Sequence, residues 1–222
     1  KLLGFDIERA KLKYDIEEVD SQIDQIIEDI YKSKRPVIMA GMGVRIADAA
    51  DELRELGEIL NIPVYPTWNA LDVVTSDYKQ YGGRIGTYGG AGRNFGVQNS
   101  DLLLAIGSRI SGRITGGNIH SFARGAKKIV VDVDPALLQK KLQQVPFDIN
   151  ILCDAKIFLG RLLNRLKNKD VLNNLPDFSL WTEKCIDWKI KYDPVKAEFF
   201  DQKKDVHPYA FMRTLSDEMT ND

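Results

Sequence analysis

Short unbroken runs of apolar residues alternate with amphipathic segments through the middle of the chain. Strands that are buried on both faces show no apolar-polar alternation, so these runs predict the strands of a parallel sheet. Six strands are expected, at residues 36–41, 62–65, near 84–85, 102–106, 128–133 and 149–153. Helices are expected between them, at about 46–60, at 91–98, from Asp134-Pro135 onward and from Asp154 to Leu166. The alternation predicts an α/β fold with a six-stranded, mostly parallel, doubly wound sheet.

Amphipathic helices flank this region on both sides. Before the first strand, apolar residues recur at helical spacing, namely Val19, Ile23, Ile26, Ile27 and Ile30. Asp20 or Ser21 is the expected N-cap of that helix. Beyond residue 168, one helix is predicted over about 180–192 and another begins at His207. The pattern therefore predicts a three-layer, Rossmann-like domain with helical extensions at its N- and C-terminal ends.

Composition narrows the classes of partner. The 222 residues suit one domain, and 44% of them are hydrophobic, which is enough for a core. The net charge of −1 gives no electrostatic footprint for nucleic acid or for an anionic membrane. No apolar run approaches the roughly 20 residues of a membrane span. We therefore expect a cytoplasmic protein that binds neither nucleic acid nor membrane.

The two cysteines are isolated and form no C-x-x-C pair, so the sequence predicts neither a zinc site nor a disulfide framework.

The segment 83–117 is the richest in candidate chemistry. Its glycines precede a helix-like run, the strand 102–106 follows, and Arg109 and Arg113 come just beyond that strand. Glycine lets a ligand approach the main chain, and arginine suits phosphate oxygens. We interpret the segment as a phosphate-binding region; the alternative is that the glycines serve turns and the arginines are solvated.

A wider site follows from the topology of parallel sheets, in which ligands bind beyond the carboxyl ends of the strands. The residues that the expected strands place there are Gly41, Gly43, Thr67, Gly107, Ser108, Arg109, Asp132 and Asp154. A dinucleotide suits this set chemically, with arginine against the pyrophosphate and carboxylates against ribose hydroxyls. Two alternatives stay open. Asp154 also stands where a helix N-cap stands, and Trp68 and Tyr88 either stack on a cofactor ring or pack against the protein.

The dinucleotide-binding fingerprint of dehydrogenases is not met. Gly41 and Gly43 supply its first two glycines, but Ile46 occupies the position of the third. The second strand also ends at Pro66 and Thr67 without the acid that binds a ribose hydroxyl. These departures argue against a classical nicotinamide-binding domain.

Four segments carry a resemblance to a known family. They are P-V-I-M-A-G-M-G, I-P-V-Y-P-T-W, the run from G-R-I-G-T-Y-G-G to G-S-R-I-S-G-R-I-T-G, and K-K-I-V-V-D-V-D-P. They resemble the central domain of thiamine-diphosphate-dependent enzymes, and acetolactate synthase large subunits most of all. The resemblance covers about residues 20–166.

The resemblance implies a longer parent chain, a homo-oligomer, in which thiamine diphosphate and Mg²⁺ support decarboxylation of a 2-oxo acid and its ligation to a second carbonyl. Residues 1–17 would link from a pyrimidine-binding domain, 18–168 would be the central domain, 169–206 a connector, and 207–222 the start of the diphosphate-binding domain. The central domain of such synthases holds FAD. The site residues implied are Gly41, Gly43, Thr67, Trp68, Tyr88, Gly89, Gly107, Ser108, Arg109, Arg113, Asp132, Val133 and Asp154.

Departures from the family pattern leave the ligand open. The usual triple glycine is Gly41-Met42-Gly43, and the usual histidine is Tyr88. The usual small or aliphatic neighbours of Thr67 are replaced by Tyr65, Pro66 and Trp68. FAD, ADP and an empty pocket are therefore all open, and so is a structural or nucleotide-binding module that has no catalytic role. The chain also lacks the G-D-G that opens the family's diphosphate-binding motif. We therefore expect these residues alone to be catalytically inactive.

Overall fold

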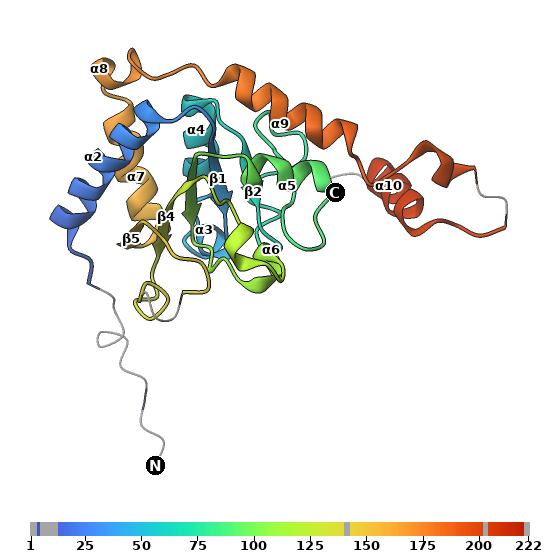
Figure 1. Ribbon diagram of the computed structural model, residues 1–222, viewed down its shortest axis with the longest axis horizontal. Coiled ribbons are helices and arrows are strands. Elements are labelled where there is room, and N and C mark those ends of the chain that lie inside the picture. Colours follow the sequence, from blue (N-terminus) through green and yellow to red (C-terminus); the bar gives the residue numbers. More distant parts are fainter. Residues whose placement is uncertain (1–3, 5–12, 140–142, 202–203, 220–222) are drawn as a thin grey trace.

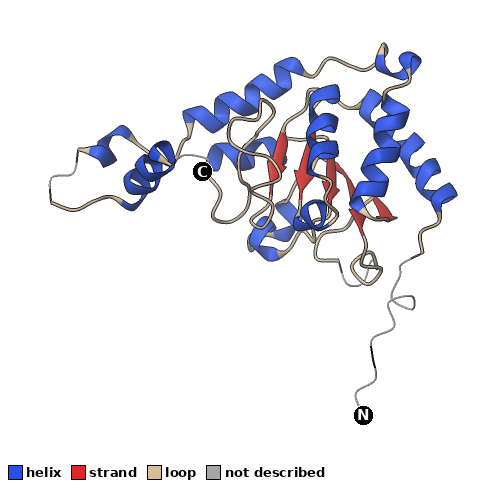
Figure 2. Ribbon diagram, turned by 180° about the vertical axis from the view of Figure 1, so that it is seen from behind, coloured by secondary structure: helices blue, strands red, loops and turns tan. Residues whose placement is uncertain are grey.

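A computed structural model of the chain describes residues 4, 13–139, 143–201 and 204–219. Its centre is a parallel sheet in the order β2-β1-β3-β4-β5 (Figures 1 and 2). The strands are β1 Pro36–Ala40, β2 Val64–Pro66, β3 Leu102–Ile106, β4 Lys127–Asp132 and β5 Ile149–Leu152. Each neighbouring pair is parallel. The α/β class with a parallel sheet is confirmed, but the expected six strands are five.

The missing strand is the one expected near 84–85. Gly83 and Gly86 flank it with φ angles of +98° and +116°, which an extended strand does not adopt. The chain instead pairs with the outer edge of β2 slightly earlier, through an isolated bridge between Val64 and Tyr81. The segment therefore turns away from the sheet before it can add a strand.

The helices have the following bounds: α2 Ile16–Lys32, α3 Met42–Ile46, α4 Ala50–Leu60, α5 Ala91–Gln98, α6 Gly112–Thr115, α7 Ala155–Leu166, α8 Lys169–Leu172, α9 Ser179–Lys191 and α10 Pro208–Glu218, with 3₁₀ turns η1 Ile119–Ser121 and η3 Ala197–Phe200. The helix expected at 46–60 begins only at Ala50, as α4, and the short helix α3 ends at Ile46 before it. Asp48 separates them with a φ of +52°. The N-cap of α2 is Asp15, which accepts a hydrogen bond from the Glu18 backbone N–H at 3.0 Å; the expected caps Asp20 and Ser21 are wrong.

The helix expected from Asp134-Pro135 is a turn over residues 135–138. Asp134 does act locally as a cap, since its Oδ1 accepts a hydrogen bond from the Ala136 N–H at 2.9 Å. The backbone then closes a tight turn, with the Leu137 N–H donating to the Asp134 carbonyl. The remainder of that expected helix includes residues 140–142, which lie outside the described residues.

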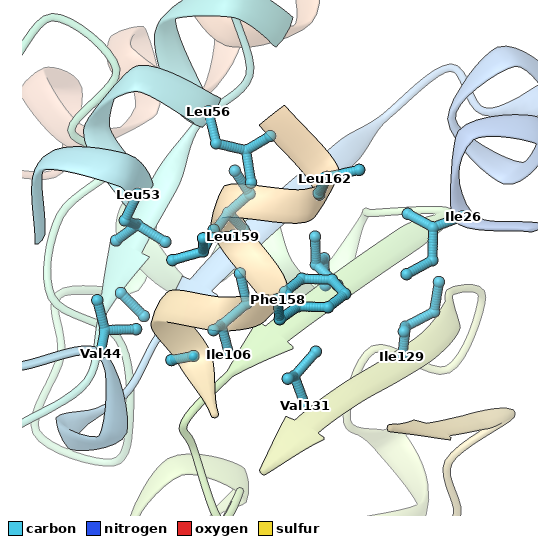
Figure 3. Packing of buried hydrophobic residues seen from close by; sticks show 14 of the residues in the cluster. Ile26, Val44, Leu53, Leu56, Ile106, Ile129, Val131, Phe158, Leu159 and Leu162 are labelled. Carbon is cyan, nitrogen blue, oxygen red and sulfur yellow. The ribbon is translucent and has the colours of Figure 1, made fainter. Parts of the chain in front are cut away.

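Helices α2, α4 and α7 cover one face of the sheet. Figure 3 shows Phe158 and Leu162 of α7 among apolar side chains from α2, α4 and the strands. Phe158 is fully buried, and a buried side chain of this size contributes about 1.5–3 kcal/mol to stability. Asp154 caps α7 as expected, with Oδ1 accepting from the Lys156 and Ile157 N–H groups at 2.8 and 3.3 Å.

Helices α5 and α9 cover the opposite face, which completes three layers. The indole N–H of Trp181 on α9 donates to the Pro36 carbonyl at the start of β1, at 3.0 Å. A Cβ on Gly92 of α5 would lie 2.0 Å from the Trp188 carbonyl oxygen, so glycine allows the two helices to pack closely. The segment expected to be a connector therefore contributes a helix to the core.

Helix α10 lies beyond α9, to one side of the sheet (Figure 1). His207 caps it, with Nδ1 accepting a hydrogen bond from the Tyr209 N–H. Arg213 of α10 pairs with Asp193 at 3.0 Å. Residues 1–3 and 5–12 of the expected linker lie outside the described residues. The division of the chain into parts of three domains stays a prediction.

Candidate functional site

The strand order defines where a ligand would sit. From β1 the chain goes outward to β2, then returns across β1 to β3 and continues through β4 to β5. Strand order therefore reverses between β1 and β3, and ligands of such sheets bind at this switch point, beyond the carboxyl ends of the strands. Ala40 and Ile106 are paired at these ends. The Gly41 N–H donates to the Ile106 carbonyl at 2.8 Å, so the loops after β1 and β3 lie side by side.

The glycines expected at this point allow the two loops to pack backbone against backbone. A Cβ on Gly41 would lie 2.0 Å from the Gly107 carbonyl oxygen, and one on Gly43 would lie 2.6 Å from the Gly107 Cα. The Gly43 N–H also donates to the Gly107 carbonyl at 3.0 Å. The two loops therefore fill the space between the strand ends, and a ligand would lie over this backbone surface. Gly89 has a different role, because its N–H closes a turn onto the Gly86 carbonyl at 2.8 Å.

Arg109 follows β3, and Asp132 ends the neighbouring strand β4. Arg109 is exposed, whereas Asp132 at the end of β4 is half-buried. Burial raises the pKa of the Asp132 carboxyl above its ordinary value, while its hydrogen bonds to backbone N–H groups and the nearby Arg109 guanidinium oppose the rise. Its Oδ1 accepts a hydrogen bond from the Asp134 N–H at 3.0 Å. The two residues offer a cation for an anionic group and, one strand away, a carboxylate that can accept hydrogen bonds from hydroxyl groups.

Arg113 is exposed on the short helix α6. Its backbone carbonyl accepts two hydrogen bonds from Thr87, from the N–H at 2.8 Å and from the hydroxyl at 3.0 Å. The loop that follows β3 is thereby tied to the loop that carries Tyr88. Ser108 is buried, and its hydroxyl lies 3.6 Å from the sulfur of Met39, so its side chain packs into the core.

The remaining expected residues are spread along the same edge. Thr67 is buried and its N–H continues the pairing of β2 by donating to the Ala40 carbonyl at 2.8 Å. Val133 is partly exposed beside Asp132. Asp154 follows the outermost strand β5, and its carboxylate is already engaged as the cap of α7. The structure therefore places Arg109 and Asp132 after neighbouring strands, and Asp154 one strand farther out.

Two exposed aromatic rings stand at the other end of the edge. Trp68 and Tyr88 are 49% and 72% exposed, with ring centroids 6.0 Å apart in an edge-to-face arrangement. Arg84 joins them: its guanidinium lies 5.0 Å from the centre of the Trp68 ring and donates to the Tyr88 carbonyl at 2.9 Å. Arg84 was not among the site residues predicted from the sequence. A basic residue directly after Gly82-Gly83 in the turn-rich segment was the available signal.

A pocket of about 110 Å³ lies between the loop 85–87, α5 and α6. It is lined by Ile85, Gly86, Thr87, Asn94, Val97, Gln98, Ile114, Thr115, Gly116 and Phe122. None of the expected site residues lines it, but Thr87 and Ile114 are the direct neighbours of Tyr88 and Arg113. A second pocket, of about 360 Å³, lies between the start of α2 and the turn at 135–139.

Within the described part of the chain, no three His, Cys, Asp or Glu side chains gather into a group that could bind a metal. No helix there is both long and apolar enough to cross a membrane.

Comparison with known proteins gives a consistent result. The family model described as "Thiamine pyrophosphate enzyme, central domain" matches residues 23–162. The probable acetolactate synthase large subunit of Methanococcus aeolicus is 38% identical over 179 residues, which are 78% of this chain and 29% of that protein. That of Methanocaldococcus jannaschii is 36% identical over 194 residues, 87% of this chain and 31% of that protein.

The acetolactate synthase large subunit of Corynebacterium glutamicum is 35% identical over 202 residues, 90% of this chain and 31% of that protein. Two chloroplastic acetolactate synthases of Nicotiana tabacum match at 33% and 32% identity. The chain thus spans less than a third of the length of these relatives.

Proposed function

The chain belongs to the central-domain family of thiamine pyrophosphate enzymes, and from this premise we propose that it binds the ADP portion of FAD, or ADP itself, at the carboxyl edge of its sheet. The observation that carries this proposal is the position of Arg109. Arg109 is exposed just beyond β3, beside the switch point, and Asp132 ends the neighbouring strand β4. Anionic diphosphate fits the arginine, and ribose hydroxyls fit the carboxylate.

The residues present suit the ADP portion of such a ligand. Arg109 and Arg113 would hold the diphosphate over the backbone surface formed by Gly41 and Gly107, and Asp132 would accept hydrogen bonds from the ribose. Bound ADP or FAD contributes its binding energy to the folded state and so stabilises the domain. FAD has a second ring system, and the exposed pair Trp68 and Tyr88 offers aromatic surface at the opposite end of the edge.

The alternative is a scaffold that binds no nucleotide. The observation that favours it is the close contact of Gly41 and Gly43 with Gly107, because these glycines then have a packing role that needs no ligand.

For the longer protein of which such a domain is part, we propose the reaction of acetolactate synthases, the name carried by the relatives. A 2-oxo acid would lose CO₂ and its acyl carbons would be joined to a second carbonyl compound. Thiamine diphosphate would supply the carbanion chemistry, and it and Mg²⁺ would be held by other domains of a homo-oligomer. This domain would act as a scaffold, and a cytoplasmic location stays a prediction.

Arg109→Ala tests the nucleotide proposal. We expect ADP and FAD to raise the melting temperature of the wild-type chain, and the replacement to abolish the shift because it removes the charge facing the diphosphate. Arg124→Ala is the matched control, since Arg124 is exposed but precedes β4, at the amino edge of the sheet. An undiminished shift in Arg109→Ala would reject this site, and no shift in the wild type would favour the scaffold.

A further inference from the structure

Ile110 has an unusual backbone conformation directly after Arg109. Its φ is +44°, in the left-handed region. The described residues contain three other non-glycine residues with positive φ, namely Asp48, Asn61 and Ala123, and none of those is β-branched. A β-branched residue is the most strained type in this region, because its side chain crowds the backbone. Such strain persists only where the surrounding structure holds it in place.

The surrounding structure holds Ile110 through burial. Its side chain is 0% exposed and belongs to the apolar cluster beneath α5 and α9. The residues on either side of this anchor behave differently: Arg109 is exposed and Ser111 is half-buried. The positive φ therefore coincides with a side chain that is buried in the core, between Arg109 just after β3 and Arg113 on α6.

A second attachment fixes the far side of the same loop. Thr87 donates two hydrogen bonds to the Arg113 carbonyl, and a Cβ on Gly86 would lie 2.8 Å from that oxygen. The Ile114 and Thr115 N–H groups donate to the Ser111 carbonyl at 2.8 and 3.1 Å. The segment between the two arginines is thus held at both ends.

We infer that Ile110 is a positioning residue that fixes Arg109 and Arg113 as a preorganised pair for a diphosphate. A fixed pair of guanidinium groups binds an anion more tightly than a mobile pair, because less conformational freedom is lost on binding. Ile110 itself touches no ligand. The role in binding rests on the proposed nucleotide function, whereas the fixing of the loop does not.

The binding test compares three variants by calorimetric titration with ADP. Ile110→Ala removes the anchor, and we expect it to weaken ADP binding about tenfold. Ile110→Val keeps a β-branched apolar anchor, and we expect it to bind as the wild type does. Ile23→Ala removes the same atoms from a fully buried position on α2, far from the loop. It should lower the melting temperature without changing ADP affinity. Equal ADP affinity in Ile110→Ala and Ile23→Ala would overturn the inference.

A second measurement needs no ligand. We expect the Thr87, Ile114 and Thr115 amides to exchange with deuterium at least about tenfold faster in Ile110→Ala than in the wild type, because their hydrogen bonds depend on the fixed loop. In Ile23→Ala, these three amides should exchange no faster than the lower overall stability of that variant requires. Unchanged protection in Ile110→Ala would overturn the positioning role. Faster exchange in Ile110→Ala, with no ADP binding by the wild type, would support the fixing of the loop by Ile110 and reject the nucleotide function.

Discussion

At the scale of single residues, Asp132 carries an energetic cost that a purely structural role does not explain. Its carboxyl is half-buried, burial raises its pKa, and the hydrogen bond that it accepts from the Asp134 N–H needs no negative charge. The amide oxygen of an asparagine could also accept that bond, though more weakly than a carboxylate does. A charged oxygen at this position is useful if it accepts hydrogen bonds from a ligand.

Asp132→Asn should therefore stabilise the protein at neutral pH. A carboxyl whose pKa is raised on folding favours the folded state when protonated, and this contribution is lost as the pH rises through the folded pKa. We expect the replacement to raise the melting temperature by about 1–3 °C at pH 7. The gain should shrink as the pH falls through the raised pKa of the folded carboxyl, and vanish below the unfolded pKa of about 3.9, where the carboxyl is protonated in both states. Melting curves across this range measure the change in stability, and ADP titrations of the same variant measure the change in ADP binding. A loss of stability at pH 7 would show that the charge itself stabilises the fold.

The sequence predicted the positions of these residues better than their roles. Arg109 and Asp132 lie at the strand ends as expected, because the apolar runs that precede them were unambiguous. Ser108 was expected at the ligand but points into the core, since burial alternates from one residue to the next at the end of β3. Arg84 was missed because its partners, Trp68 and Tyr88, lie 16 and 4 residues away and become neighbours only in the folded chain.

At the scale of elements, glycines decide how α9 joins the domain. A Cβ on Gly92 would lie 2.0 Å from the Trp188 carbonyl oxygen, and one on Gly96 would lie 1.8 Å from the Tyr65 hydroxyl oxygen. The second contact places the Tyr65 side chain, from β2, directly beneath α5. The close approach of α5 and α9 therefore depends on glycine, which has no side chain to separate them.

Gly92→Ala should destabilise the protein by about 1–3 kcal/mol, because the added methyl group must push α9 away from α5. Gly160→Ala is the matched control, since Gly160 lies within α7 and nothing stands within 4 Å of its Cβ position. That change should stabilise by roughly 0.5–1 kcal/mol through helix propensity. Urea unfolding measures both. Equal effects of the two changes would show that α9 does not pack on α5 as described.

The elements that the sequence predicted well are those whose signals are local. The apolar run of β1 and the Asp154 cap of α7 depend on adjacent residues, and both are found. The strand near 84–85 and the helix from Asp134 depend on what the rest of the chain offers. The edge of β2 is already paired at Tyr81, so the strand does not form, and residues 135–138 form a turn in place of the start of a helix.

At the scale of the whole molecule, the chain spans 29–31% of its archaeal and corynebacterial relatives. The residues that it does contain build a sheet with a switch point and an exposed arginine, but the sequence has no G-D-G. We therefore expect no release of CO₂ from pyruvate by these 222 residues supplied with thiamine diphosphate and Mg²⁺. A coupled assay for CO₂ checks this, and turnover above the background without protein would contradict it.

The most direct test of the central claim is an amide chemical-shift map of the chain titrated with ADP. We expect saturable shifts at Gly107, Arg109 and Arg113, together with Asp132 and Val133 one strand away, and their loss in Arg109→Ala. Shifts that gather instead around the pocket between α2 and residues 135–139, or that never saturate, would contradict a nucleotide site at the carboxyl edge of the sheet.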